Sequence, residues 1–281
     1  MNLSVERRQT SLGSRTLSYL AAGPLPGDRL VVLLHAFPLS ADMWLPQLQA
    51  LPDGWAALAP DFRGFGGSSP DYEGPRAEAR LEDYADDVGE LLDGLGVPQA
   101  ALCGCSMGGY TAFAIMRRFP GRATGLLLAD TRATADSDAA RASRTAMLDL
   151  LDREGPAAVA AEMRPKLVGP TSQGERPQVL ETVDRLMRQA TAPGIGFAVS
   201  RMRNRPDAAP ELHGFRGPVS IVVGEEDALT PPADAASMAA SLRRAAFVTI
   251  PRAGHLSNLE APDAFNTAMG AWLAAVSEAS A

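Results

Sequence analysis

Short apolar runs recur along this chain, and each is followed by a segment whose apolar residues have helical spacing. The runs are residues 30–34 (LVVLL), 55–60 (WAALAP), 100–103 (AALC), 125–129 (GLLLA), 219–223 (VSIVV) and 246–250 (AFVTI). Nearly continuous apolar runs of this length are typical of parallel strands that are buried on both faces. The alternation therefore predicts an α/β fold in which helices flank a mostly parallel sheet.

The helical spacing marks five segments outside the middle of the chain. They are residues 40–50, 81–95, 107–118, 233–242 and 262–276. The first twenty residues have the pattern of two antiparallel strands joined near Gly13, which extend one edge of the sheet. With the six apolar runs, they give an expected sheet of eight strands.

The middle of the chain, residues 131–210, shows helical patterns and no convincing strand. We predict that it is a helical cap, inserted after the sixth strand, because α/β sheets bind ligands at their carboxyl edge. The expected division is then a core of residues 1–130 and 211–281 and a cap of residues 131–210. The alternative is a helical dimerisation module, which leaves a homodimer open.

Composition restricts the partners and the compartment. The net charge is −7 and the pI is near 5.1, so we expect no broad basic face for nucleic acid. No stretch is apolar enough for a membrane span or a signal peptide. Cys103 and Cys105 are too far apart on an extended strand to bridge each other, and free thiols suggest a reducing compartment. We therefore expect a cytoplasmic protein.

The clearest chemical signal is the sequence GCSMG at residues 104–108, directly after the apolar run 100–103. It is a G-x-S-x-G pattern in the strand, turn and helix context that such a motif requires. Ser106 is then a nucleophile on a strained turn, and Gly104 and Gly108 leave room for neighbouring backbone. The alternative is a glycine-rich turn with an idle serine.

A serine hydroxyl needs an adjacent base, and the chain has only three histidines. In proteins with this motif the chain order is serine, acid, histidine, which selects His255 over His35 and His213. His255 also follows the last expected strand.

The acid should follow the preceding strand, and Asp227 in the sequence GEEDALTPP is the choice. It would hold the imidazole in the required tautomer. Glu225 and Glu226 compete with it, and Asp130, at the end of the run 125–129, is a further alternative.

Acyl transfer also needs donors for an oxyanion. The backbone N–H of Met107, at the start of the helix after Ser106, is one expected donor. The other should come from the loop after residues 30–34, where Pro38 has no N–H, so Phe37 or Ala36 must supply it.

Five segments carry a resemblance to a known family. They are HAFP, DFRGFGGS, GCSMGG, GEEDALTPP and PRAGHLSNLEAP, between residues 35 and 262. The set resembles the α/β-hydrolase superfamily, and within it small capped serine esterases, enol-lactonases and cofactor-free haloperoxidases or perhydrolases. The resemblance implies the α/β-hydrolase fold. It also implies that the second oxyanion donor is the N–H of Phe37. The family more usually has glycine where this chain has Ala36.

The expected activity is hydrolysis of a small carboxylic ester or lactone through an acyl-serine, without a cofactor or a metal. The same three side chains also serve carbon–carbon bond hydrolysis and acyl transfer, and a ligand receptor would keep the fold without turnover. The perhydrolase relatives carry proline at the position of Pro38, which implies peracid formation as a side activity unless Pro38 only stiffens a turn.

Residues 131–210 contain 12 Lys and Arg against 10 Asp and Glu, although the whole chain is acidic. This excess favours an anionic substrate such as a carboxylated lactone. The alternative is that these arginines form solvated helix faces.

Overall fold

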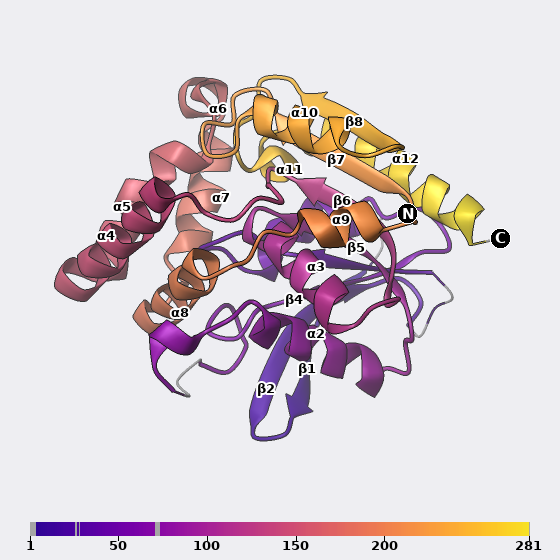
Figure 1. The fold of residues 1–281 in the computed structure, drawn as a ribbon, viewed down its shortest axis with the longest axis horizontal. Helices are drawn as coiled ribbons and strands as arrows, with labels where there is room; N and C mark the ends of the chain where they lie inside the picture. Colours follow the sequence, from indigo (N-terminus) through magenta and orange to yellow (C-terminus); the bar gives the residue numbers. More distant parts are fainter. Residues whose placement is uncertain (1–3, 26, 28, 71–73, 281) are drawn as a thin grey trace.

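An eight-stranded sheet runs through the molecule, as the computed structural model of residues 4–25, 27, 29–70 and 74–280 shows (Figure 1). The strands lie in the order β1-β2-β4-β3-β5-β6-β7-β8. Their bounds are β1 Val5–Leu12, β2 Arg15–Ala22, β3 Leu30–Leu34, β4 Ala56–Pro60, β5 Ala100–Cys105, β6 Ala123–Ala129, β7 Val219–Gly224 and β8 Ala245–Ile250.

The pairing of the strands confirms a mostly parallel sheet. β1 pairs with β2, and β2 pairs with β4, both in antiparallel fashion. From β4 onward, β4, β3, β5, β6, β7 and β8 are parallel to one another. Every residue of β3, β4, β5 and β7 is buried, so both faces of the central sheet are covered. This burial explains the nearly continuous apolar runs, because a strand covered on both faces has no polar side.

Helices outside the middle of the chain flank the sheet. Their bounds are α1 Leu45–Gln49, α2 Glu82–Gly94, α3 Met107–Arg118, α10 Pro232–Ala240, α11 Ser257–Glu260 and α12 Pro262–Ala279. α3 packs on β3, β5 and β6 and lies in front of the sheet in Figure 1, and α12 packs along β6, β7 and β8. The sequence pattern predicted each of these helices except the short α11.

Two elements differ from the sequence expectation. β8 is not buried on both faces: Ala246, Phe247 and Thr249 are exposed, Phe247 to 43%. β8 is the last strand of the sheet, so it has a neighbouring strand on one side alone. The expected helix at residues 40–50 is a 3-10 turn, Ala41–Trp44, followed by the short α1. Pro46, the second residue of α1, has no N–H that could extend α-helical hydrogen bonds back into the 3-10 turn.

Helices alone connect β6 to β7, as the sequence predicted. They are α4 Asp138–Glu154, α5 Pro156–Leu167, α6 Pro170–Glu175, α7 Pro177–Met187, α8 Ala192–Arg203 and α9 Ala209–Gly214. Figure 1 shows α4, α5, α7 and α8 grouped at one side of the sheet, whereas α9 packs beside α3. Residues 131–210 are called the helical segment below; its predicted end at residue 210 falls inside α9.

Both cysteines lie in the central strand β5, are buried and form no disulfide. Burial raises the pKa of each thiol above its ordinary value. Among the described residues, no helix is both long and apolar enough to cross a bilayer.

Candidate active site

Ser106 occupies the sharp turn between β5 and α3. Its φ is +52°, which a side-chain-bearing residue adopts rarely, and its N–H donates to the Ala129 carbonyl at 2.9 Å. A Cβ on Gly108 would lie 2.0 Å from the Leu34 carbonyl oxygen, and one on Gly104 would lie 2.4 Å from the Gly108 backbone. The glycines of the motif therefore allow this turn to pack against neighbouring backbone.

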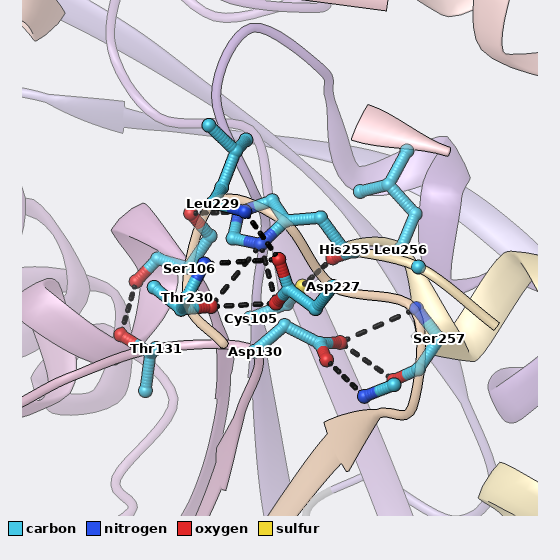
Figure 2. Close-up of polar contacts among 12 residues, drawn as sticks. Cys105, Ser106, Asp130, Thr131, Asp227, Leu229, Thr230, His255, Leu256 and Ser257 are labelled. Atoms are coloured by element: carbon cyan, nitrogen blue, oxygen red, sulfur yellow. Dashed lines mark hydrogen bonds and ion pairs between the residues drawn. The ribbon is translucent and has the colours of Figure 1, made fainter. Parts of the chain in front are cut away.

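His255 lies between β8 and α11 and connects two of the predicted site residues (Figure 2). Its Nε2 is 2.7 Å from Ser106 Oγ, and its Nδ1 is 2.8 Å from Asp227 Oδ2. Only 3% of His255 is exposed. The structure thus brings the predicted serine, histidine and aspartate into one hydrogen-bonded chain.

The loop after β7 fixes the Asp227 carboxylate from its other side. Oδ1 accepts the N–H groups of Leu229 at 2.8 Å and Thr230 at 2.9 Å, and Oδ2 accepts the Thr230 hydroxyl at 2.6 Å. With His255, four donors surround this carboxylate. Its orientation toward the imidazole is therefore fixed by its own turn (Figure 2).

Charge interactions shift the pKa values of Asp227 and His255 in opposite directions. Burial opposes a charge on Asp227, but the neighbouring His255 and the Thr230 hydrogen bonds lower the pKa of the carboxyl below its ordinary value. Burial likewise opposes a charge on His255, but Asp227, with smaller contributions from Asp130 and Glu260, raises the pKa of the imidazole. The pair is thus arranged to stabilise an imidazolium beside a carboxylate.

Asp130, the alternative acid, is fully buried but makes different contacts. Its carboxyl accepts the Ser257 hydroxyl at 2.6 Å (Figure 2). It also accepts the Gly224 N–H at 2.8 Å. Burial, together with the charge of Asp227, raises the pKa of Asp130 to about 8. Asp130 therefore ties the end of β7 to the start of α11, whereas Asp227 bonds the histidine.

The other candidate residues have partners elsewhere. Glu226 accepts the Thr171 N–H at 2.9 Å, and Glu225 accepts the Arg252 N–H at 3.1 Å. His35 Nε2 accepts the Phe62 N–H at 3.0 Å, and burial lowers the pKa of His35 to about 4. His213 is exposed on α9.

The loop after β3 distinguishes the two candidate oxyanion donors. The Ala36 N–H donates to Met43 Sδ at 3.1 Å, which leaves the N–H of Phe37. Met107 is the first residue of α3, where an N–H has no acceptor within the helix. These contacts favour Phe37 and Met107 as the pair of donors.

A cavity of about 430 Å³ opens onto Ser106 and His255. Part of its lining comes from α3 and from the loops that follow the strands, which are called the sheet side below, and part comes from the helical segment. The lining consists of Phe37, Ser106, Tyr110, Arg132, Asp136, Ala140, Ser143, Arg144, Ala146, Met147, Glu162, Met163, Lys166, Leu167, Met202, Leu229, Thr230 and His255. The sequence did not single out Tyr110, Arg132, Asp136 or Arg144. For Arg132 a signal existed, because it follows β6 at the carboxyl edge of a parallel sheet.

The described residues contain no group of three or more His, Cys, Asp or Glu side chains that could hold a metal ion. The polar atoms around Ser106 bond one another instead, as Figure 2 shows.

Comparison with known proteins places the chain in a family. The family model of the α/β-hydrolase fold matches residues 29–262. A thermophilic esterase from Thermogutta terrifontis, solved with malate bound, is 35% identical, with a TM-score of 0.88 over 96% of this chain and 99% of its own. The enol-lactonase from Burkholderia xenovorans LB400 is 27% identical, with a TM-score of 0.84 over 95% of this chain and 100% of its own.

A curated relative gives the same result from sequence. The 3-oxoadipate enol-lactonase 2 of Acinetobacter baylyi is 28% identical over 255 residues, which cover 91% of this chain and 92% of the relative. The family match and these relatives extend over nearly the whole chain. The chain belongs to the α/β-hydrolase superfamily and is a hydrolytic enzyme of that superfamily.

Proposed function

We propose that the protein hydrolyses a small carboxylic ester or lactone through an acyl intermediate on Ser106. The observation that carries this proposal is the chain of contacts from Ser106 Oγ to His255 Nε2 at 2.7 Å and from His255 Nδ1 to Asp227 Oδ2 at 2.8 Å. The names of the relatives, esterase and enol-lactonase, support an ester or lactone as the bond that is cleaved.

In the first half-reaction, Ser106 Oγ attacks the carbonyl carbon while His255 Nε2 takes the hydroxyl proton. The N–H groups of Phe37 and Met107 stabilise the tetrahedral oxyanion. When the intermediate collapses, the bond to the alcohol oxygen breaks and His255 donates its proton to that oxygen. In a lactone the alcohol stays attached to the acyl group.

In the second half-reaction, a water molecule attacks the acyl-serine and gives its proton to His255. The second oxyanion collapses, Ser106 recovers its proton from His255, and a carboxylic acid leaves. Asp227 stays ionised throughout and stabilises the imidazolium, which the lowered pKa of its carboxyl supports. No cofactor enters either half-reaction.

We also propose that residues 131–210 form a cap over this site, with residues 1–130 and 211–281 as the core. Met147, Met163 and Met202 of the helical segment line the same cavity as Ser106 and His255. The volume of that cavity suits a small molecule.

The test combines a fluorophosphonate probe with a panel of p-nitrophenyl esters and lactones. The probe should attach to the peptide that contains Ser106 and abolish hydrolysis, and Ser106→Ala should remain unlabelled. A folded wild-type protein without labelling and without turnover would point instead to a ligand receptor. Cleavage of carbon–carbon substrates, acyl transfer to alcohols or peracid formation in preference to hydrolysis would also contradict the proposal.

A further inference from the structure

The cavity above Ser106 is lined with an excess of positive charge in a chain whose net charge is −7. Arg132, Arg144 and Lys166 face Asp136 and Glu162 in the lining. Lys166 and Glu162 pair with each other at 2.8 Å and are about half exposed, at 45% and 46% of their side chains. The cations that matter are therefore the two arginines.

The carboxylate nearest to Arg144 is already neutralised from the other side. Asp136 contacts Arg144 Nε at 3.2 Å and also bonds Arg205, whose side chain is 3% exposed and lies outside the cavity lining. One carboxylate thus lies between two guanidinium groups. The positive charge of Arg144 is consequently not balanced within this cluster.

The second arginine, Arg132, follows β6, two residues after Asp130. It lines the cavity together with Ser106, Thr230 and His255. Its Nη2 donates to the Leu229 carbonyl and lies 3.4 Å from Asp234, whose side chain is 41% exposed. These are the polar contacts that Arg132 makes with the described residues, and both involve Nη2. The N–H groups of Nε and Nη1 remain for another acceptor.

We propose that the substrate carries a carboxylate besides its ester or lactone group, and that Arg132 binds this carboxylate while Arg144 adds attraction. The inference rests on the proposed function and names its substrate class. Each of these remaining N–H groups can donate a charge-assisted hydrogen bond to a carboxylate oxygen. Arg132 is then a specificity residue that orients the carbonyl toward Ser106.

The test uses two methyl esters of equal length, monomethyl glutarate and the methyl ester of glutaric acid monoamide. They differ only in whether the distal group is a carboxylate or a neutral amide. We expect wild-type kcat/KM to be about tenfold higher or more for the carboxylate, the range for a hydrogen bond to a charged group. Raising the salt concentration should reduce this ratio, because the arginine is partly exposed.

Arg132→Gln should reduce the ratio toward one, mainly through KM for the anionic ester, and Arg132→Lys should retain part of it. The matched control is Arg141→Gln on α4, which removes the same charge outside the cavity lining. Arg141 is 47% exposed and pairs with Asp138 at 3.1 Å. This control should leave the ratio at the wild-type value.

Three results would overturn the inference. Equal wild-type kcat/KM for the two esters would do so and leave the proposed function intact. An equal loss of kcat/KM for both esters in Arg132→Gln would show that Arg132 only holds the Leu229 loop in place. If neither ester nor any p-nitrophenyl ester is hydrolysed and Ser106 is not labelled, the proposed function fails and the inference fails with it.

Discussion

The sheet side and the helical segment contribute to the same cavity in different ways. On the sheet side, Ser106, Asp227 and His255 follow β5, β7 and β8, and their atoms are fixed by backbone contacts within buried turns. In the helical segment the packing is uneven: α8 is buried over residues 194–202, whereas α4, which contributes more of the cavity lining than any other helix of that segment, buries only Met147 and Leu151. The difference suggests that backbone packing sets the positions of Ser106, Asp227 and His255. Substrate choice would then depend on the cavity-lining side chains of the helical segment.

The largest expected effect tests whether the three side chains act as one unit. Ser106→Ala and His255→Ala should each lower kcat by roughly 10⁶-fold, and the double variant should be little worse than either single variant. Steady-state kinetics with a p-nitrophenyl ester measures this, and circular dichroism checks that each variant is folded. Multiplying losses in the double variant would show that the two residues work independently.

The second prediction compares the two buried aspartates. Asp227→Asn should lower kcat by about 10⁴-fold, because the amide favours the wrong imidazole tautomer. Asp130→Asn should have a much smaller effect, since Asp130 bonds Gly224 and Ser257 and not His255. A greater loss in Asp130→Asn would reassign the acid to the end of β6.

The third prediction compares a glycine of the sheet side with one of the helical segment. Gly108→Ala should lower the free energy of unfolding by about 3 kcal/mol, because its Cβ would lie 2.0 Å from the Leu34 carbonyl oxygen. Gly174→Ala, in the helix α6, should raise it by about 0.5–1 kcal/mol, because open space surrounds its Cβ. Urea titrations give both values. Similar values for the two would remove the contrast between the regions.

The fourth prediction concerns the pH dependence of kcat/KM. His255 must be neutral to act as a base, and its pKa is raised, so activity should be lost as the pH falls through a midpoint above 6.5. Asp227→Asn removes the carboxylate that raises this pKa most, so the midpoint of its residual activity should move to lower pH. Arg141→Gln, in the helical segment, should leave the midpoint in place. A wild-type midpoint below 6.5 would contradict the arrangement described for the histidine and its carboxylates.

The sequence predicted the fold and the candidate catalytic residues because both depend on local patterns. Fully buried strands leave apolar runs, and Ser106 and Asp227 follow the runs of two such strands, β5 and β7. His255 follows the apolar run of β8, which is partly exposed. Parallel strands end at the same edge of the sheet, so residues after different strands meet there. The roles of these three residues remain predictions that the experiments above test.

The lining of the cavity was not predictable in the same way. Which faces of α4, α5 and α8 line the cavity depends on contacts between distant segments, such as that of Asp136 with Arg205. The exposure of β8 depends on its place at the edge of the sheet, which no local pattern encodes. Tyr110 and Arg144 therefore became candidates only once the helices were placed.

The reactivity of the two thiols of β5 reports on the opening of this central strand. Cys105 directly precedes Ser106, and both cysteines are inaccessible and hold their protons because burial raises the pKa of each thiol. Alkylating reagents attack the ionised form, so modification must wait until this strand separates from its neighbours. The rate of thiol modification in the native protein thus reports how often the strand that carries the nucleophile becomes exposed.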